Sequence, residues 1–201
     1  MKSKQIKVGE RFIKKLFEPS FAGKVQKQYE LLLKDHPNDP PPLQRHSYGK
    51  ILPLIAAVQV KIEEGKSTEE AIQEVQDIFY KRFVYSGRDT MKKMLKIPLA
   101  YKLFLPITIQ VVEKIYGYDA GFSYQVLEFS SKHVEYDILE CPYHNLCSQY
   151  GLPEMTDIFC TSDDIVNEDA HKNLVFERSK TLGRGDEKCD FHFYRKDLVQ
   201  K

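Results

Sequence analysis

Apolar side chains recur every three to four positions through the first 118 residues, a spacing that is typical of helices packed on a core. The predicted helices cover residues 5–17, 21–34, 48–64, 68–84, 90–95 and 107–115. Between Ile51 and Val60 the chain is apolar nearly all round the helix, which predicts a buried, central element. Ser67 and Glu70 have the spacing of a capping box, which predicts the start of the helix that follows.

Proline and glycine mark the places where helical order is expected to stop. The run Pro40-Pro41-Pro42 separates the second and third helices, because proline removes a backbone donor and disfavours αR geometry for the residue before it. Gly87 is expected to end the fourth helix, and Pro106 to break the apolar segment 97–112. That segment is shorter than the ~20 residues that span a bilayer, so no membrane partner is expected.

From residue 122 the apolar period changes from the helical value to two, which indicates strands. Strands are expected over residues 122–129, 133–139, 173–178 and 188–194, with short helices over 142–150 and 162–170. Gly183 and Gly185 permit the turn that precedes the last strand. The pattern therefore predicts an α+β fold: a helical region at residues 1–118 and a region at 119–201 with a small antiparallel sheet, together forming one compact unit.

Composition and charge narrow the class of protein. With 201 residues, 42% apolar and 29% charged, the chain has the length and composition of a folded globular protein. Residues 1–100 carry 19 Lys and Arg against 12 Asp and Glu, and residues 101–201 carry 11 against 17, which we interpret as two solvated faces of opposite sign. No basic stripe interleaved with aromatic residues indicates a nucleic-acid partner. The first residues lack the apolar segment of a signal peptide, so a cytoplasmic location and reduced cysteines are expected.

All four cysteines lie between residues 141 and 189. Their spacing does not match the paired ligands of zinc fingers or ribbons. Cys141 follows a predicted strand, Cys160 precedes a predicted helix, and Cys189 begins the last strand, so these three positions can converge in space. Cys147 lies within a predicted helix, where packing is its expected role. Because free cysteine is commonly buried as a small apolar residue, a purely structural role stays open for each.

Cys160 is expected immediately before the helix over residues 162–170. An ordinary thiol has a pKa of about 8.5 and is mostly protonated at neutral pH, and the amides and dipole at a helix N-terminus favour its ionised form. Asp163 follows three residues later and is a candidate base or ligand. His192 follows Cys189 at an odd spacing, so the two are expected on opposite faces of the last strand.

Three segments together resemble the L-2-amino-thiazoline-4-carboxylate hydrolase family: Glu140-Cys141-Pro142-Tyr143, Phe159-Cys160-Thr161-Ser162-Asp163 and Gly185-Asp186-Glu187-Lys188-Cys189-Asp190-Phe191. The resemblance covers residues 119–195. The C-terminal pattern is also distantly similar to the 4-vinyl reductase ligand-binding domain, which implies a small-molecule pocket. The family implies hydrolysis of a cyclic C=N–S unit: water adds to the amidine-like carbon, a carbon–nitrogen bond opens, and N-carbamoyl-L-cysteine forms.

Carried onto this chain, the resemblance implies a site made of Cys141, Cys160, Asp163, Cys189 and Asp190. Two mechanisms fit these residues. In one, the thiolates of Cys141, Cys160 and Cys189 hold a divalent metal such as Zn²⁺, which lowers the pKa of its bound water. In the other, Cys160 or Cys189 attacks the amidine carbon while Asp163 or Asp190 moves protons. The second is favoured because the chain has no compact pair of metal ligands.

In either mechanism, Arg178 or Arg184 would hold the substrate carboxylate, since a guanidinium suits bidentate recognition. The expected partner is thus a small-molecule substrate, and a homo-oligomer is left open. A non-catalytic small-molecule or metal-binding sensor module is the alternative from a different functional class. A structural or interaction protein with buried cysteines is the third.

Overall fold

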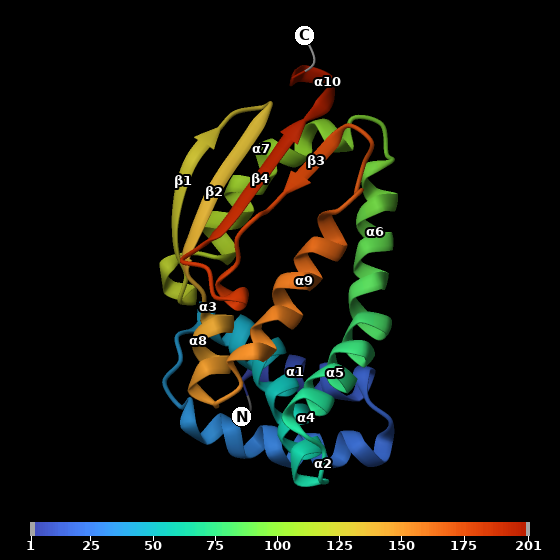
Figure 1. Ribbon diagram of the computed structural model, residues 1–201, viewed down its shortest axis with the longest axis vertical. Coiled ribbons are helices and arrows are strands. Elements are labelled where there is room, and N and C mark those ends of the chain that lie inside the picture. Colours follow the sequence, from blue (N-terminus) through green and yellow to red (C-terminus); the bar gives the residue numbers. More distant parts are fainter. Residues whose placement is uncertain (1–2, 200–201) are drawn as a thin grey trace.

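The computed structural model describes residues 3–199 and has the expected α+β fold (Figure 1). Its helices are α1 Lys4–Leu16, α2 Pro19–Leu32, α3 Pro41–His46, α4 Leu52–Glu63, α5 Thr68–Phe79, α6 Tyr85–Leu95, α7 Ala100–Ile115, α8 Pro142–Gln149, α9 Thr156–Asn167 and α10 Lys196–Val199. Within the described part of the chain, no helix is both long enough and apolar enough to cross a membrane.

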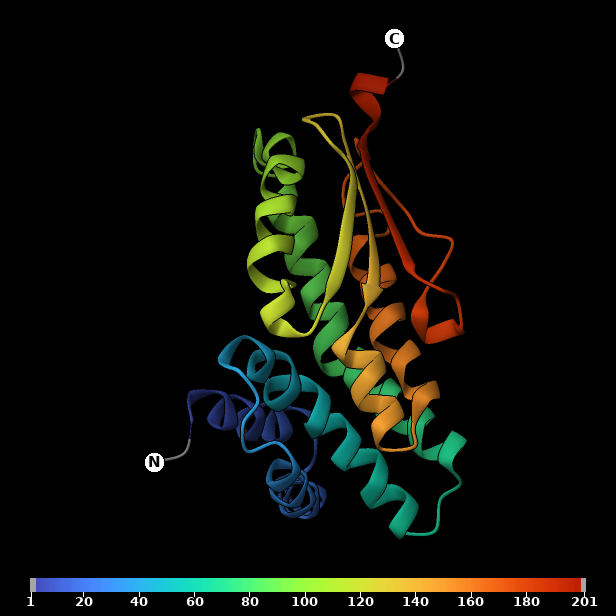
Figure 2. The ribbon, with the colours of Figure 1, turned by 90° about the vertical axis from the view of Figure 1, so that its left-hand side faces the viewer.

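Four strands form one antiparallel sheet in the order β1-β2-β4-β3. They are β1 Ser123–Phe129, β2 His133–Glu140, β3 Leu174–Glu177 and β4 Cys189–Arg195, so the predicted strands are confirmed to within one residue at each end. The register places Ile138 of β2 opposite Cys189 of β4. Helix α7 lies along one face of the sheet (Figure 2), and Leu105 and Val112 of α7 pack there in one buried cluster with Val134.

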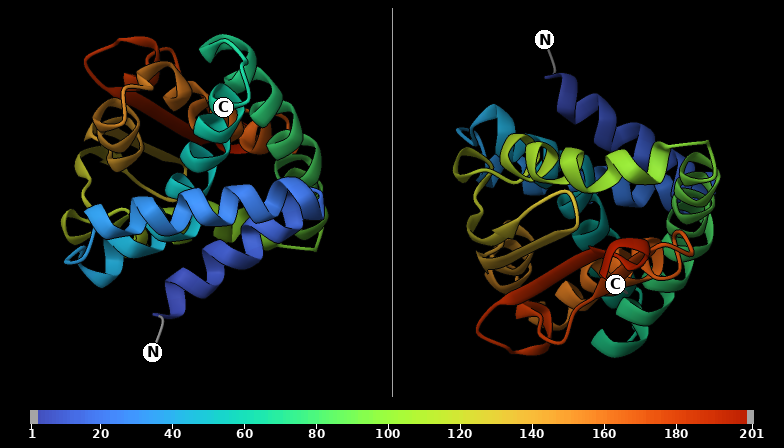
Figure 3. Two further views of the ribbon diagram at one scale, coloured as in Figure 1. Left: turned by 90° about the horizontal axis from the view of Figure 1, so that it is seen from below. Right: turned by 90° about the horizontal axis from the view of Figure 1, so that it is seen from above.

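A second buried cluster fills the lower part of the molecule, where α1 and α2 lie beneath the other helices (Figure 3). Helix α4 lies at its centre, and eight of its twelve residues are buried, which confirms the expected central helix. Helices α8 and α9 contribute Leu146 and Phe159 to the same cluster, and the short 3-10 turn between them contributes Met155. Packing therefore joins the helical region to segments that follow residue 119.

Gly87 and Pro106 do not end helices, so two expectations were wrong. The chain continues from α5 through a π-helical turn at Tyr80–Val84 into α6, where Gly87 is exposed with open space around it. Glycine within a helix costs about 1 kcal/mol relative to alanine, which the burial of Val84 and Leu95 outweighs. Helix α7 likewise runs through Pro106. The proline removes a donor from the carbonyl of Lys102, an exposed residue where water can replace it.

Helix α9 begins at Thr156, not at residue 162 as predicted. The polar residues that resembled a helix start are satisfied inside the helix. The Ser162 hydroxyl donates to the Phe159 carbonyl at 2.7 Å, and the Thr161 hydroxyl donates to the Asp157 carboxylate at 3.3 Å. Cys160 therefore lies inside α9, and the expectation that a helix N-terminus stabilises its thiolate is wrong.

Candidate functional site

A cavity of about 610 Å³ is lined by residues of the sheet, α6, α7 and α9. Figure 3 shows the arrangement of these elements from above. Among the residues that line it are Cys141, Cys160, Asp163, Arg178 and Cys189. These side chains come from the end of β2, from α9, from the segment after β3 and from the start of β4. The structure thus brings together residues that lie as many as 48 positions apart in the sequence.

The thiols of Cys160 and Cys189 lie in the wall of the cavity, close enough together to shift each other's pKa. The backbone N–H of Leu182 donates to Cys189 Sγ at 3.3 Å. Gly183 follows in the same turn, and a Cβ atom at this position would lie 2.8 Å from Cys160 Sγ. The glycine therefore permits the turn to approach both sulfurs.

The pairing separates the acidities of the two thiols. The hydrogen bond to Cys189, together with burial, raises the pKa of Cys160, while the same hydrogen bond lowers the pKa of Cys189 against its burial. The Leu182 N–H also lowers the pKa of Cys189. Because the Leu182 N–H donates to its sulfur, Cys189 is the better placed of the two to carry a thiolate. Burial raises the pKa of Cys141 to about 12, against the opposing effect of nearby backbone N–H groups, so this thiol stays protonated.

Asp163 extends from α9 into the cavity. About half of its side-chain surface, 51%, is free of protein contact. Because Asp163 lines the cavity, protein atoms surround this surface at a distance even where none touches it. Burial raises its pKa to about 6, against the attraction of Arg178 and Lys50. A carboxyl group that titrates near neutral pH is suited to proton transfer.

The Arg178 side chain is only 2% exposed, and its Nη2 binds α9. Its Nη2 donates to the Cys160 carbonyl at 2.6 Å and also to the Asp164 carboxylate. Nη1 lies 3.8 Å from the nearer carboxylate oxygen of Asp163, and the guanidinium stacks over the ring of Phe191 at 5.0 Å. Nε is buried with no hydrogen-bond partner among the described residues. Arg178 thus joins α9 to the sheet beside the thiol pair.

Lys50 lines the cavity, and the sequence analysis did not identify it. Its ammonium lies 5.9 Å from the centre of the Tyr143 ring, and among residues 3–199 it has no carboxylate within ion-pair distance. Burial lowers the pKa of Lys50, and the charge of Asp163 opposes this change. One signal was present: Lys50 is the cation immediately before the apolar run that begins at Ile51.

A π-helical turn, Ser47–Ile51, holds Lys50 in place between α3 and α4. Pro53 has no N–H to donate to the Gly49 carbonyl, which weakens the α-helical register at this point. The Leu52 N–H bonds instead to the Ser47 carbonyl, five residues earlier. The Tyr48 carbonyl, left without that partner, accepts the Tyr29 hydroxyl at 2.9 Å.

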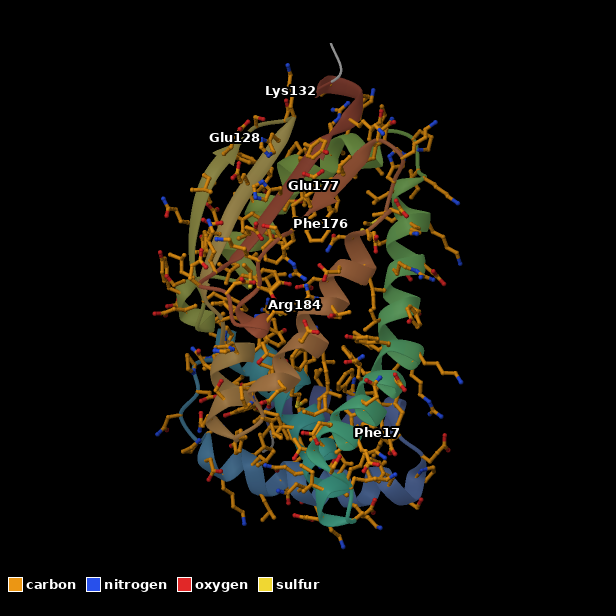
Figure 4. All side chains as sticks on the ribbon, viewed as in Figure 1. Phe17, Glu128, Lys132, Phe176, Glu177 and Arg184 are labelled. Atoms are coloured by element: carbon orange, nitrogen blue, oxygen red, sulfur yellow. The ribbon has the colours of Figure 1, made fainter. Side chains whose placement is uncertain are left out.

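Asp190 and Arg184 lie outside the cavity. Asp190 accepts the N–H groups of Ser179 and Lys180 at 2.9 and 2.6 Å, and the Ser179 hydroxyl at 2.6 Å. Burial would raise its pKa, but these hydrogen bonds prevail and hold it below the ordinary value. Arg184 is exposed beside α9 (Figure 4), where it pairs with Asp157 at 2.8 Å. Both residues fasten the segment between β3 and β4.

Cys141, Cys160 and Cys189 do not form a group of three potential metal ligands whose atoms all lie within 4.8 Å of one another. Among the described residues, one group of three potential metal ligands has its atoms within 4.8 Å of one another, and it consists of His133, Glu135 and His192. On β4, His192 alternates with Cys189, so this group lies on the sheet face opposite the thiols. We derive no step through a metal.

Comparison with known proteins gives one finding. Residues 44–193 match the family described as L-2-amino-thiazoline-4-carboxylic acid hydrolase. The match begins well before residue 119 and includes Lys50, so it extends to helices that the resemblance in sequence did not cover. Neither the curated proteins nor the solved structures contain a match to the chain. Because the family match spans more than half of its residues, the chain belongs to the L-2-amino-thiazoline-4-carboxylic acid hydrolase family.

Proposed function

We propose that the protein hydrolyses a cyclic amidine with an N=C–S unit, such as 2-amino-thiazoline-4-carboxylate, and that Cys189 is the nucleophile. The observation that carries the proposal is the Cys160–Cys189 pair beside Asp163 in one enclosed cavity. Thiolate is the nucleophilic form of cysteine, and the Leu182 N–H, which donates to Cys189 Sγ, favours this form at Cys189.

The first step forms a covalent intermediate on Cys189. The substrate enters as an amidinium cation and pairs with the Asp163 carboxylate. The Cys189 thiolate attacks the amidine carbon, and the bond between that carbon and the ring sulfur breaks. The ring sulfur leaves as a thiol with the proton of the amidinium, which leaves a neutral isothiourea attached to Cys189.

The second step releases the product. Water adds to the same carbon; one of its protons goes to Asp163 and the other to the former ring nitrogen. The carbon–Cys189 bond then breaks, which gives N-carbamoyl-L-cysteine and restores the thiolate. Both carbon–nitrogen bonds of that carbon persist into the product. The expectation that a carbon–nitrogen bond opens is therefore wrong for this reaction, and a carbon–sulfur bond opens.

Lys50 is the group that we assign to the substrate carboxylate. Its ammonium faces the cavity without an ion-pair partner among the described residues, whereas Arg178 is largely committed to α9 and Arg184 is exposed outside the cavity. A cation without an ion-pair partner is stabilised by an incoming anion. The carboxylate of the ligand would pair with Lys50, and its amidinium with Asp163.

The test is turnover of 2-amino-thiazoline-4-carboxylate, measured as release of a free thiol and of N-carbamoyl-L-cysteine by mass spectrometry. Cys189→Ala should lower turnover by about a thousandfold or more, with unchanged circular dichroism. Cys147→Ala is the matched control, because Cys147 is buried in the helical core and does not line the cavity. Wild-type turnover by folded Cys189→Ala would exclude the covalent mechanism.

Binding without turnover is the second candidate, and the apolar lining of most of the cavity favours it. In that case the purified protein would bind 2-amino-thiazoline-4-carboxylate in calorimetry but release no thiol. Product formation that requires Cys189 would exclude this candidate.

A further inference from the structure

The cavity has two ends of different chemistry. Its charged and thiol side chains are Lys50, Cys141, Cys160, Asp163, Arg178 and Cys189. From there the lining extends along β4 to Phe193 and along α7 to Phe104, whose rings lie 5.8 Å apart. Cys189 and Phe193 are separated by four positions on the strand, about 13 Å at the rise of a β-strand.

The remaining polar residues of the lining are occupied by their own helices. The hydroxyls of Thr108 and Ser162 donate to the Phe104 and Phe159 carbonyls at 2.8 and 2.7 Å. The Asn167 amide donates to the Asp163 carbonyl at 2.9 Å. Apart from the charged and thiol end, the tyrosine hydroxyls and the acceptor oxygens of these three side chains, the described lining therefore offers a ligand apolar surface.

The volume exceeds what the head group needs. A cavity of about 610 Å³ has the size of sites that enclose drug-sized molecules, whereas the amino-thiazoline carboxylate is a single five-membered ring with small substituents. A small polar ligand would leave much of the apolar lining uncovered. The complex would then lack the dispersion contacts and the hydrophobic burial that this lining can provide.

The apolar end also reaches the surface at α7. Leu103 and Ile107 line the cavity and are 56% and 50% exposed. At 3.6 residues per turn they lie on the side of α7 away from Leu105 and Ile109, which are buried. They therefore form an apolar rim, which allows a chain longer than the cavity to pass outward.

We infer that the ligand of this cavity is an amphiphile, with its polar head at Lys50, Asp163 and the thiols and an alkyl chain along α7 and β4 toward Phe104 and Phe193. Only the identity of the head group, a cyclic amidine, rests on the proposed function. It makes the substrate class an alkylated cyclic amidine instead of the unsubstituted thiazoline carboxylate.

The experiment is calorimetric binding of two homologous series to the wild-type chain: the carboxylates from butanoate to decanoate and the corresponding alkyl amidines. In at least one series, each added methylene should strengthen binding by about fourfold. Leu103→Asp places a carboxylate in the apolar end and should weaken decanoate or its amidine far more than the butyl member. Gln110→Asp is the matched control, on an exposed position of α7 outside the cavity.

Affinity that is independent of chain length in both series would overturn the inference, and so would equal effects of Leu103→Asp and Gln110→Asp. The wild-type series decides the matter even where Leu103→Asp does not fold. Turnover of the thiazoline with no effect of chain length would reject the amphiphile and keep the proposed function. A chain-length effect with no turnover of any amidine would reject the hydrolase and keep the amphiphile.

Discussion

The lower and upper parts of the molecule are built from similar apolar residues but pack differently. In the lower part, α4 is surrounded by helices, and Leu54, Ile55 and Val58 have no exposed surface. In the upper part, α7 contacts the sheet through Leu105 and Val112, while Leu103 on its other side remains 56% exposed. The first arrangement fills space, and the second encloses a cavity.

The difference separates stability from ligand binding. A residue packed on all sides contributes its full burial to the folded state, whereas a residue that faces a cavity contributes that burial only when a ligand covers it. The charged residues also differ between the cavity and the rest of the molecule. Lys50, from the helical side, and Asp163, from α9, face the cavity, whereas most described ion pairs are at the surface.

The largest expected difference is between two substitutions of the same kind in the two parts. Leu54→Ala should lower the free energy of unfolding by about 2 to 5 kcal/mol, since it leaves a hole in a filled core. Leu103→Ala, also within a helix, should change it by about 0.5 kcal/mol or less in the absence of a ligand. Urea denaturation followed by circular dichroism measures both.

Equal losses at Leu54 and Leu103 would contradict the division into a filled part and a hollow part. The comparison is sharpened by repeating the Leu103→Ala measurement with a bound alkyl ligand. The variant should then be stabilised less than the wild type, because stabilisation by a ligand follows its affinity.

Substitution of two glycines should change the free energy of unfolding by smaller amounts, and in opposite directions. Gly183→Ala should destabilise the protein by about 1 to 3 kcal/mol, because the added Cβ would lie 2.8 Å from Cys160 Sγ and 3.2 Å from the backbone nitrogen of Asp157. Gly87→Ala should stabilise it by up to about 1 kcal/mol, since Gly87 lies in a helix with open space around it. Thermal unfolding of both variants checks the signs.

Turnover distinguishes the two glycine variants further. Gly183→Ala should also impair turnover, because the turn that it distorts donates the Leu182 N–H to Cys189. Gly87→Ala should leave turnover unchanged. A Gly183→Ala protein with wild-type stability and turnover would show that the turn does not shape the thiol pair.

Local patterns were sufficient to predict most of the fold. The strands follow from alternation along short segments, and the capping box of Ser67 and Glu70 forms as predicted. The start of α9 was missed because Thr161 and Ser162 have the residue types of a helix cap, yet bond inside the helix. Gly87 and Pro106 do not interrupt their helices, because tertiary packing outweighs the cost of about 1 to 3 kcal/mol for glycine or proline within a helix.

The site was only partly predictable, because its residues depend on distant contacts. The sequence indicates that Cys141, Cys160 and Cys189 can converge, but only the turn at Leu182 shows which two sulfurs pair. Asp190 stands beside Cys189 in the sequence, but alternation along β4 turns it to the other face. Lys50 lies in the cavity because a π-helical turn holds it there and because residues of the sheet form the rest of the lining. The residues next to Lys50 in the sequence indicate neither feature.

Asp163 should make stability and turnover change in opposite directions with pH. Burial raises the pKa of Asp163 from 3.8 to about 6, so the folded state binds this proton more tightly than the unfolded state does. Its contribution to stability is complete below about pH 4 and is lost as the pH rises to about 6. Turnover should change in the opposite direction and fall about tenfold per unit below pH 6, because the ionised carboxylate accepts the proton of water.

Urea denaturation and kcat/KM across this range measure the two trends at Asp163. Asp163→Asn should remove its part of the pH dependence of stability and most of the turnover. Asp77→Asn, at an exposed position of α5, should leave both trends unchanged. Turnover that stays constant down to pH 4 would exclude Asp163 as the base. This carboxylate therefore costs stability at the pH where its ionised form is needed for chemistry.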